Sequence, residues 1–113
     1  MGHYIANLRD IEFCLFDLLE REEILGKSIY KDLDRETSMG MLEEVKRMAE
    51  NDLAASFVDS DQKGVEFNPA TGDAKLPESF KKSYKTFMDN EWWRIDAPVE
   101  LGGTAIPPSV RWA

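Results

Sequence analysis

The sequence is poor in the two residue types that build most metal and nucleophilic centres. It has one histidine, His3, and one cysteine, Cys14, among 113 residues. No His-based triad, dyad or zinc site therefore has enough members. A lone cysteine cannot form an internal disulfide, which suits a reducing compartment. We expect His3 to be a surface residue and Cys14, on an apolar helical face, to be a small buried hydrophobe.

Basic charge and long apolar runs are scarce as well. The chain has 14 Lys and Arg against 22 Asp and Glu, a formal net charge of -8, which argues against a nucleic-acid or anionic-membrane partner. No stretch approaches the roughly 20 apolar residues of a membrane span, and the first residues lack the pattern of a signal peptide. We therefore predict a soluble, cytoplasmic protein that forms one small domain with a modest core.

What the sequence does contain is apolar residues at helical spacing. The first helix is expected over residues 8–20, with Phe13 and Phe16 widening its apolar arc and Gly26 ending the run. The arc consists of Leu8, Ile11, Cys14, Leu15, Leu18 and Leu19. Because this face is too apolar to be left in water, we expect it to pack on another surface and the chain to form oligomers.

Two further helices flank a turn-rich connector. Asp34 is a typical N-cap, with Glu36 in the first turn, for a longer second helix. Its core stripe is Met41, Leu42, Val45, Met48, Ala49, Leu53 and either Ala55 or Phe57. Pro77 and Glu78 open a third helix. Its apolar stripe is Phe80, Tyr84, Phe87 and Met88, with Trp92 as a further candidate.

The connector and the last residues are rich in turn formers. Val65, Phe67, Ala74 and Leu76 flank "NPATGD", which predicts an irregular hairpin. The double glycine in "LGGTA" predicts a tight bend that needs positive φ or a close backbone approach. The double proline in "IPPSVRWA" predicts the first turn of a helix. The fold class is therefore all-α, a small helical domain with a short irregular hairpin connector.

The segment from Asp59 to Gly64 resembles part of a calcium-binding loop. "DSDQKG" matches the first, third and sixth positions of such a loop, where oxygen ligands and a sharp glycine turn are needed. The fifth position is Lys63, and the twelfth, where a bidentate glutamate should stand, is Ala70. A polar helix end is the favoured interpretation, and calcium is expected to leave the protein unchanged.

The remaining candidates also have a simpler structural interpretation. Glu43 and Glu44 point to different sides of a helix and are typical of a solvated face. "LGGTA" lacks the strand-to-helix setting of a dinucleotide loop and has no Walker lysine. Trp92 and Trp93 must face different ways, so one of them could contact a partner. The residues alone predict a helical domain without catalytic, cofactor-binding or metal-binding residues.

Four runs resemble the N-terminal region of bacterial acyl-CoA dehydrogenases, especially the branch with an extra N-terminal segment. They are "HYIANLRDIEFCLFDLLE", "EEVKRMAENDLAASF", "FNPATGDAKLPESFKKSYKTFMDNEWWRIDAPVELGG" and "IPPSVRWA", which together span essentially the whole chain. The resemblance implies an N-terminal extension with an apolar helix over residues 1–33. Residues 34–113 would form part of the family's N-terminal helical domain.

The resemblance also implies what this chain lacks. In the family, FAD is held by a middle β-domain, a C-terminal helical bundle and a neighbouring subunit, and the catalytic glutamate belongs to that bundle. No residue here matches these positions, so the resemblance implies an N-terminal fragment with a structural, non-catalytic role. Its partners would be the remainder of the enzyme and further copies in a homo-oligomer. The parent's substrate would be a fatty acyl-CoA or a methylthio-propanoyl-CoA. The alternative is a stand-alone helical protein-interaction module, which a reading frame ending after Ala113 would favour.

Overall fold

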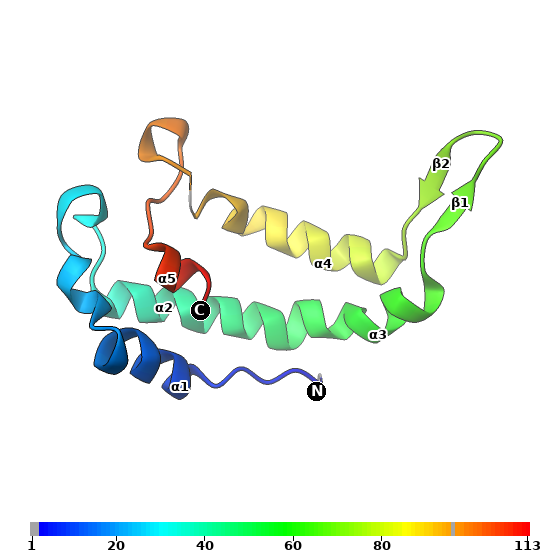
Figure 1. Cartoon of the computed structure of the whole chain (residues 1–113). Coiled ribbons are helices and arrows are strands. Elements are labelled where there is room, and N and C mark those ends of the chain that lie inside the picture. Colours follow the sequence, from blue (N-terminus) through cyan, green and yellow to red (C-terminus); the bar gives the residue numbers. More distant parts are fainter. Residues whose placement is uncertain (1–2, 96) are drawn as a thin grey trace.

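A computed structural model describes residues 3–95 and 97–113, and these are mostly helical. Figure 1 shows one long rod, in which α2 (Arg35–Met48) continues through a π-helical turn (Ala49–Leu53) into α3 (Ala54–Lys63). Two other helices, α1 (Leu8–Glu12) and α4 (Glu78–Asp89), lie along this rod. The prediction of a helical fold with one short hairpin is confirmed.

The first helix changes its winding halfway. After α1, the residues Phe13–Leu18 form a π-helix, in which the Leu19 N–H donates to the Cys14 carbonyl, five residues back. Each turn of a π-helix holds more residues than an α-helical turn, so the face that points inward shifts. Leu15 and Phe16 are buried, whereas Cys14, Leu18 and Leu19 are exposed. The prediction of a buried Cys14 is therefore wrong.

The first helix also ends earlier than expected. The π-helical segment ends at Leu18, and Glu20 adopts a left-handed conformation with φ 49°. Two 3-10 turns follow, Arg21–Ile24 and Ser28–Tyr30, with Gly26 at φ 70° between them. Gly26 thus ends the first of these turns and not the helix itself, which corrects the predicted boundary.

The long rod begins as its sequence predicts and then changes register. The Thr37 N–H donates to the Asp34 side chain at 2.7 Å, which confirms Asp34 as the N-cap. Within the π-helical turn the Ala54 N–H donates to the Ala49 carbonyl, again five residues back. Beyond this turn the buried residues are Ala54 and Ser56. The predicted core positions Ala55 and Phe57 are wrong, because both are exposed.

The connector forms the expected hairpin. Strands β1 (Glu66–Asn68) and β2 (Asp73–Lys75) pair antiparallel, with Phe67 opposite Ala74. The Asn68 side chain accepts the Ala70 N–H at 3.0 Å, and the turn is completed by Gly72 at φ 76°. Figure 1 shows the hairpin standing away from the helices.

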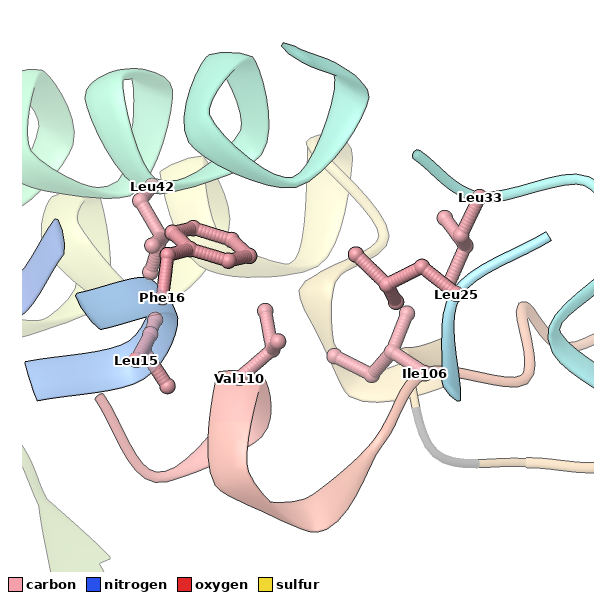
Figure 2. Packing of buried hydrophobic residues seen from close by; sticks show 7 residues of the cluster. All are labelled: Leu15, Phe16, Leu25, Leu33, Leu42, Ile106 and Val110. Carbon is pink, nitrogen blue, oxygen red and sulfur yellow. The ribbon is translucent and has the colours of Figure 1, made fainter. Parts of the chain in front are cut away.

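The main core lies where the rod, the first helix and the last residues meet. Figure 2 shows its buried side chains, which are Leu15, Phe16, Leu25, Leu33, Leu42, Ile106 and Val110. Pro107 caps α5 (Pro108–Arg111), so the double proline begins a helix as predicted. This core joins residues from before and after the predicted boundary between residues 33 and 34, and that boundary stays a prediction.

The molecule is elongated for its length. Its radius of gyration is 17.4 Å, against about 13 Å for a compact domain of this size. Its accessible surface is 8229 Å², whereas about 6,300 Å² is typical of a folded monomer of this mass. The chain therefore exposes about 1,900 Å² more than a compact monomer would.

Candidate functional site

A large apolar groove lies between α3, the residues that flank the hairpin, and α4. It encloses about 570 Å³. Its lining residues are Leu53, Ser56, Phe57, Ser60, Asp61, Gly64, Val65, Leu76, Pro77, Phe80, Ser83, Tyr84 and Phe87. The α4 stripe predicted from the sequence supplies one wall through Phe80, Tyr84 and Phe87. The predicted stripe faces an open groove and not the main core.

Two small polar residues form the floor of this groove. Ser83 is buried, and its hydroxyl donates to the Asp52 carbonyl at 2.8 Å. Ser56 is buried as well, and its hydroxyl donates to the Leu53 carbonyl at 3.0 Å. Because both hydroxyls are satisfied by backbone within the protein, the floor has little left to offer a polar ligand. The spacing of apolar residues along the sequence does not predict these two hydrogen bonds.

A polar clasp joins the last turns of α3 to the start of α4. The Ser79 hydroxyl, at the start of α4, donates to the Asp59 carboxylate, and Lys63 forms an ion pair with the same carboxylate at 2.8 Å. The hydrogen bonds from Lys63 and then Ser79 lower the pKa of Asp59 below its ordinary value. Asp59 therefore holds the ends of α3 and α4 together as a carboxylate.

The same clasp explains the residues that resemble a calcium loop. Asp59 to Lys63 lie in the last turns of α3, and Gly64 is its C-cap. A helical backbone does not present the oxygen ligands of a calcium loop, and Lys63 already neutralises Asp59. Within the described ranges, 3–95 and 97–113, no three His, Cys, Asp or Glu side chains gather as metal ligands would. Calorimetric titration is expected to show no micromolar calcium binding.

The N-terminal segment runs alongside the rod. The Ala6 N–H donates to the Glu50 carboxylate at 2.9 Å. His3 lies against Phe57, with ring centroids 5.1 Å apart, and Figure 1 shows this segment running alongside the rod. His3 is exposed, as predicted. Phe57 thus contacts the N-terminal segment and also lines the groove.

The acidic pair on α2 behaves as its spacing predicts. Glu43 and Glu44 are both exposed, and Glu44 forms an ion pair with Arg47 at 3.0 Å. These carboxylates belong to a solvated helix face.

The double glycine forms the tight bend that the sequence predicts. Gly102 has φ 79°. A Cβ on Gly103 would lie 2.0 Å from the carbonyl oxygen of Ala97. The Gly103 N–H donates to the Pro98 carbonyl at 3.1 Å, and the Thr104 N–H donates to the Arg94 carbonyl at 3.0 Å. One glycine thus supplies the conformation and the other the close approach.

These residues do not fit the phosphates of a flavin dinucleotide. A phosphate cradle needs free backbone N–H groups at the start of a helix. The bend follows a 3-10 turn (Val99–Leu101), and its N–H groups at Gly102, Gly103 and Thr104 all donate to nearby carbonyls. Within the described residues the bend is therefore a structural turn.

The tryptophan pair divides as predicted. Both residues lie in a 3-10 turn (Trp92–Arg94) that follows α4. Trp92 is half-buried and lines a pocket of about 130 Å³ beside α2 and α5. Trp93 is exposed, with the guanidinium of Arg94 4.8 Å from its ring centroid.

Membrane insertion of a helix is not supported by any described part of the chain. None of the helices formed by residues 3–95 and 97–113 combines the length and the apolar character needed to cross a bilayer.

Comparison with known proteins shows that this helical region is similar to part of two acyl-CoA dehydrogenases. The chain is 41% identical over all 113 residues to the broad-specificity linear acyl-CoA dehydrogenase FadE5 of Mycobacterium tuberculosis. It is 28% identical over 107 residues, 95% of its length, to the 3-methylmercaptopropionyl-CoA dehydrogenase of Ruegeria pomeroyi. No protein-family model matches the chain.

The chain matches an N-terminal region of acyl-CoA dehydrogenases, as the sequence resemblance predicts. It spans 18% of the length of each of these two relatives. The likeness therefore concerns a region of such enzymes and leaves the activity of a whole enzyme to be proposed.

Proposed function

We propose that these 113 residues are the N-terminal helical part of an FAD-dependent acyl-CoA dehydrogenase, which oxidises an acyl-CoA thioester between its α and β carbons. The single observation that supports this proposal most strongly is the 41% identity to an acyl-CoA dehydrogenase over the full length of the chain. Because the match covers all 113 residues, it includes the turns and the helices alike.

Within that enzyme the proposed role of this region is architectural. Three described carboxylates, Asp34, Asp59 and Glu78, have a shifted pKa. Hydrogen bonds to local partners lower the pKa of each. A general base works best with a pKa near the operating pH, so these groups suit capping and clasping. The bend at Gly102 uses its own N–H groups internally. The catalytic base and the flavin contacts are accordingly assigned to the rest of the enzyme.

The parent enzyme is further proposed to be cytoplasmic and homo-oligomeric. The exposed side of the first helix supports the second point, since Phe13, Leu18 and Leu19 are large, apolar and exposed. A second subunit would remove this face from water. The substrate is proposed to be an acyl-CoA, as the names of both relatives indicate for those proteins.

The test compares the 113-residue chain with the full product of its reading frame. Both are purified, and acyl-CoA oxidation is measured with an artificial electron acceptor. The expected result is turnover by the full product and none by the 113-residue chain, because dehydrogenation needs a base and an electron acceptor held in one pocket. Turnover by the short chain, or an inactive full product, would contradict the proposal.

A stand-alone helical interaction module remains the second candidate. The observation that favours it is the set of exposed large apolar side chains, which a docking module also presents. A natural stop codon directly after Ala113 would support this alternative.

A further inference from the structure

The apolar groove offers a docking surface of defined composition. Resting on the proposed function, we propose that the groove between α3, the residues that flank the hairpin, and α4 receives an apolar segment of the same dehydrogenase polypeptide. That segment lies outside these 113 residues. The groove thus serves as a permanent contact between this region and the rest of the enzyme.

The walls of the groove are unsuited to permanent contact with water. Phe57 is 64% exposed and Tyr84 56% exposed, although both line the same hollow. Among all the lining residues the only charged side chain is Asp61. None of the lysines of α4 lines the groove. Lys85, for example, forms an ion pair with Asp89. The helix is therefore divided into a solvated face and an apolar face that stays open to solvent along the groove.

The hairpin at the end of the groove gives a second, independent argument. Each of its strands has three residues, and all six are exposed. A two-stranded hairpin of this size is only marginally stable in water without a surface to pack on. Phe67, in the middle of β1, is 64% exposed. A small ligand could fill the groove but could not cover the hairpin, so the occupant is a protein segment.

The exposed area fits a permanent contact better than a transient one. The excess of about 1,900 Å² over a compact monomer is more than twice the roughly 800 Å² that each partner buries in a standard protein complex. Areas of this size are typical of obligate interfaces. A standard partner, which buries about 800 Å² on each side, would cover less than half of this excess.

The length of the relatives favours the same polypeptide as the occupant. The chain matches both over nearly its whole length but covers only 18% of each. More than four-fifths of such an enzyme is therefore available to cover the groove within one subunit. A segment of the same chain needs no separate encounter, because it is held at high effective concentration.

Cysteine labelling tests this proposal. Tyr84→Cys places a thiol in the groove, and Lys85→Cys, the next residue along α4, places one on the solvated face. Both are made in a Cys14→Ser background, in the 113-residue chain and in the full product of its reading frame. Labelling by N-ethylmaleimide is followed by peptide-resolved mass spectrometry, so that other cysteines of the full product do not interfere. Circular dichroism checks that each variant is folded, and Phe80→Cys serves as a second groove position.

We expect both thiols to react at similar rates in the dilute 113-residue chain. In the full product the groove thiol should react at least about 100-fold more slowly, because a packed side chain reacts only when its surroundings open. The Lys85→Cys thiol should keep its rate. Unchanged reactivity of both groove positions in the full product would overturn the proposal. Protection in the short chain that rises with its concentration would assign the groove to a second copy, which also overturns it.

The same preparations separate this inference from the proposed function. A full product that oxidises acyl-CoA but leaves the groove thiol reactive contradicts the docking surface alone. A full product that protects the groove thiol but shows no oxidation supports the docking surface and contradicts the function. A reading frame that ends after Ala113 contradicts both.

Discussion

The close approach at Gly103 allows the sharpest prediction about the bend. Gly103→Ala adds a Cβ that would lie 2.0 Å from the Ala97 carbonyl oxygen and 2.4 Å from its carbonyl carbon. These are backbone atoms, so no side chain can rotate away to relieve the overlap. The loop must shift, and the hydrogen bond from the Gly103 N–H to the Pro98 carbonyl is then strained or lost.

Overpacking of this kind costs about 1–3 kcal/mol of unfolding free energy. For a chain of this size, each kcal/mol shifts the melting temperature by about 4–8 °C. We therefore expect Gly103→Ala to melt at least about 5 °C below the parent chain in a thermal scan followed by circular dichroism.

Gly40→Ala is the matched control. Gly40 lies within α2, and no atom lies within 4 Å of the Cβ that alanine would add. Alanine is favoured over glycine inside a helix by about 0.5–1 kcal/mol, so this variant should melt at a higher temperature than the parent. The same chemical change thus has opposite signs at two positions. The reasoning fails if Gly103→Ala melts within a degree or two of the parent, or if both variants shift in the same direction.

Three further predictions follow from single contacts. Ser83→Ala removes the buried hydroxyl that donates to the Asp52 carbonyl, and urea denaturation should show a loss of about 1–2 kcal/mol. Hydrogen bonds from the backbone and side chain of Thr37 lower the pKa of Asp34. Its stabilising effect is therefore complete above the ordinary pKa of about 4 and is lost as pH falls through the lower folded value. Asp34→Asn should flatten this acid limb in urea denaturation at several pH values, and an unchanged limb would contradict the assignment. The 113-residue chain should associate at high concentration in sedimentation experiments, and the Leu18→Glu variant should associate less. A monodisperse monomer would contradict the proposal that the exposed face of the first helix mediates association.

Local signals in the sequence are enough to predict where several elements begin or turn. Asp34 caps the long helix, Pro77 precedes α4, and "NPATGD" turns the hairpin, each through contacts with residues close by in the chain. Gly102 needs positive φ because of its own backbone conformation. Such features depend on one residue and its near neighbours, and these are visible in a sequence.

The side chains that point inward were harder to predict because of the two π-helical turns. The predicted helical faces rest on a periodicity of 3.6 residues, which fails after Phe13 and again after Ala49. The predictions of a buried Cys14 and of Ala55 or Phe57 in the core are therefore wrong, since all three residues are exposed. A π-helical turn gives no fixed residue pattern, since it depends on the packing around it.

The sequence predicts only one wall of the groove. The apolar stripe of α4 follows helical spacing, so Phe80 and Tyr84 could be recognised. The opposite wall comes from α3 beyond the π-helical turn, and the floor depends on the contact of Ser83 with Asp52, 31 residues away. Contacts across such a distance arise from tertiary packing, which spacing along one helix does not reveal.

The size and colour of the native protein test the central claim most directly. An antibody against the solvated face of α2, which carries Glu43, Glu44 and Arg47, isolates the polypeptide from its source cells under native conditions, and its intact mass and absorption spectrum are measured. The account predicts a polypeptide between five and six times as long as this chain, as in the relatives, that carries a bound flavin. A colourless polypeptide of 12.9 kDa would contradict the claim and favour a stand-alone module.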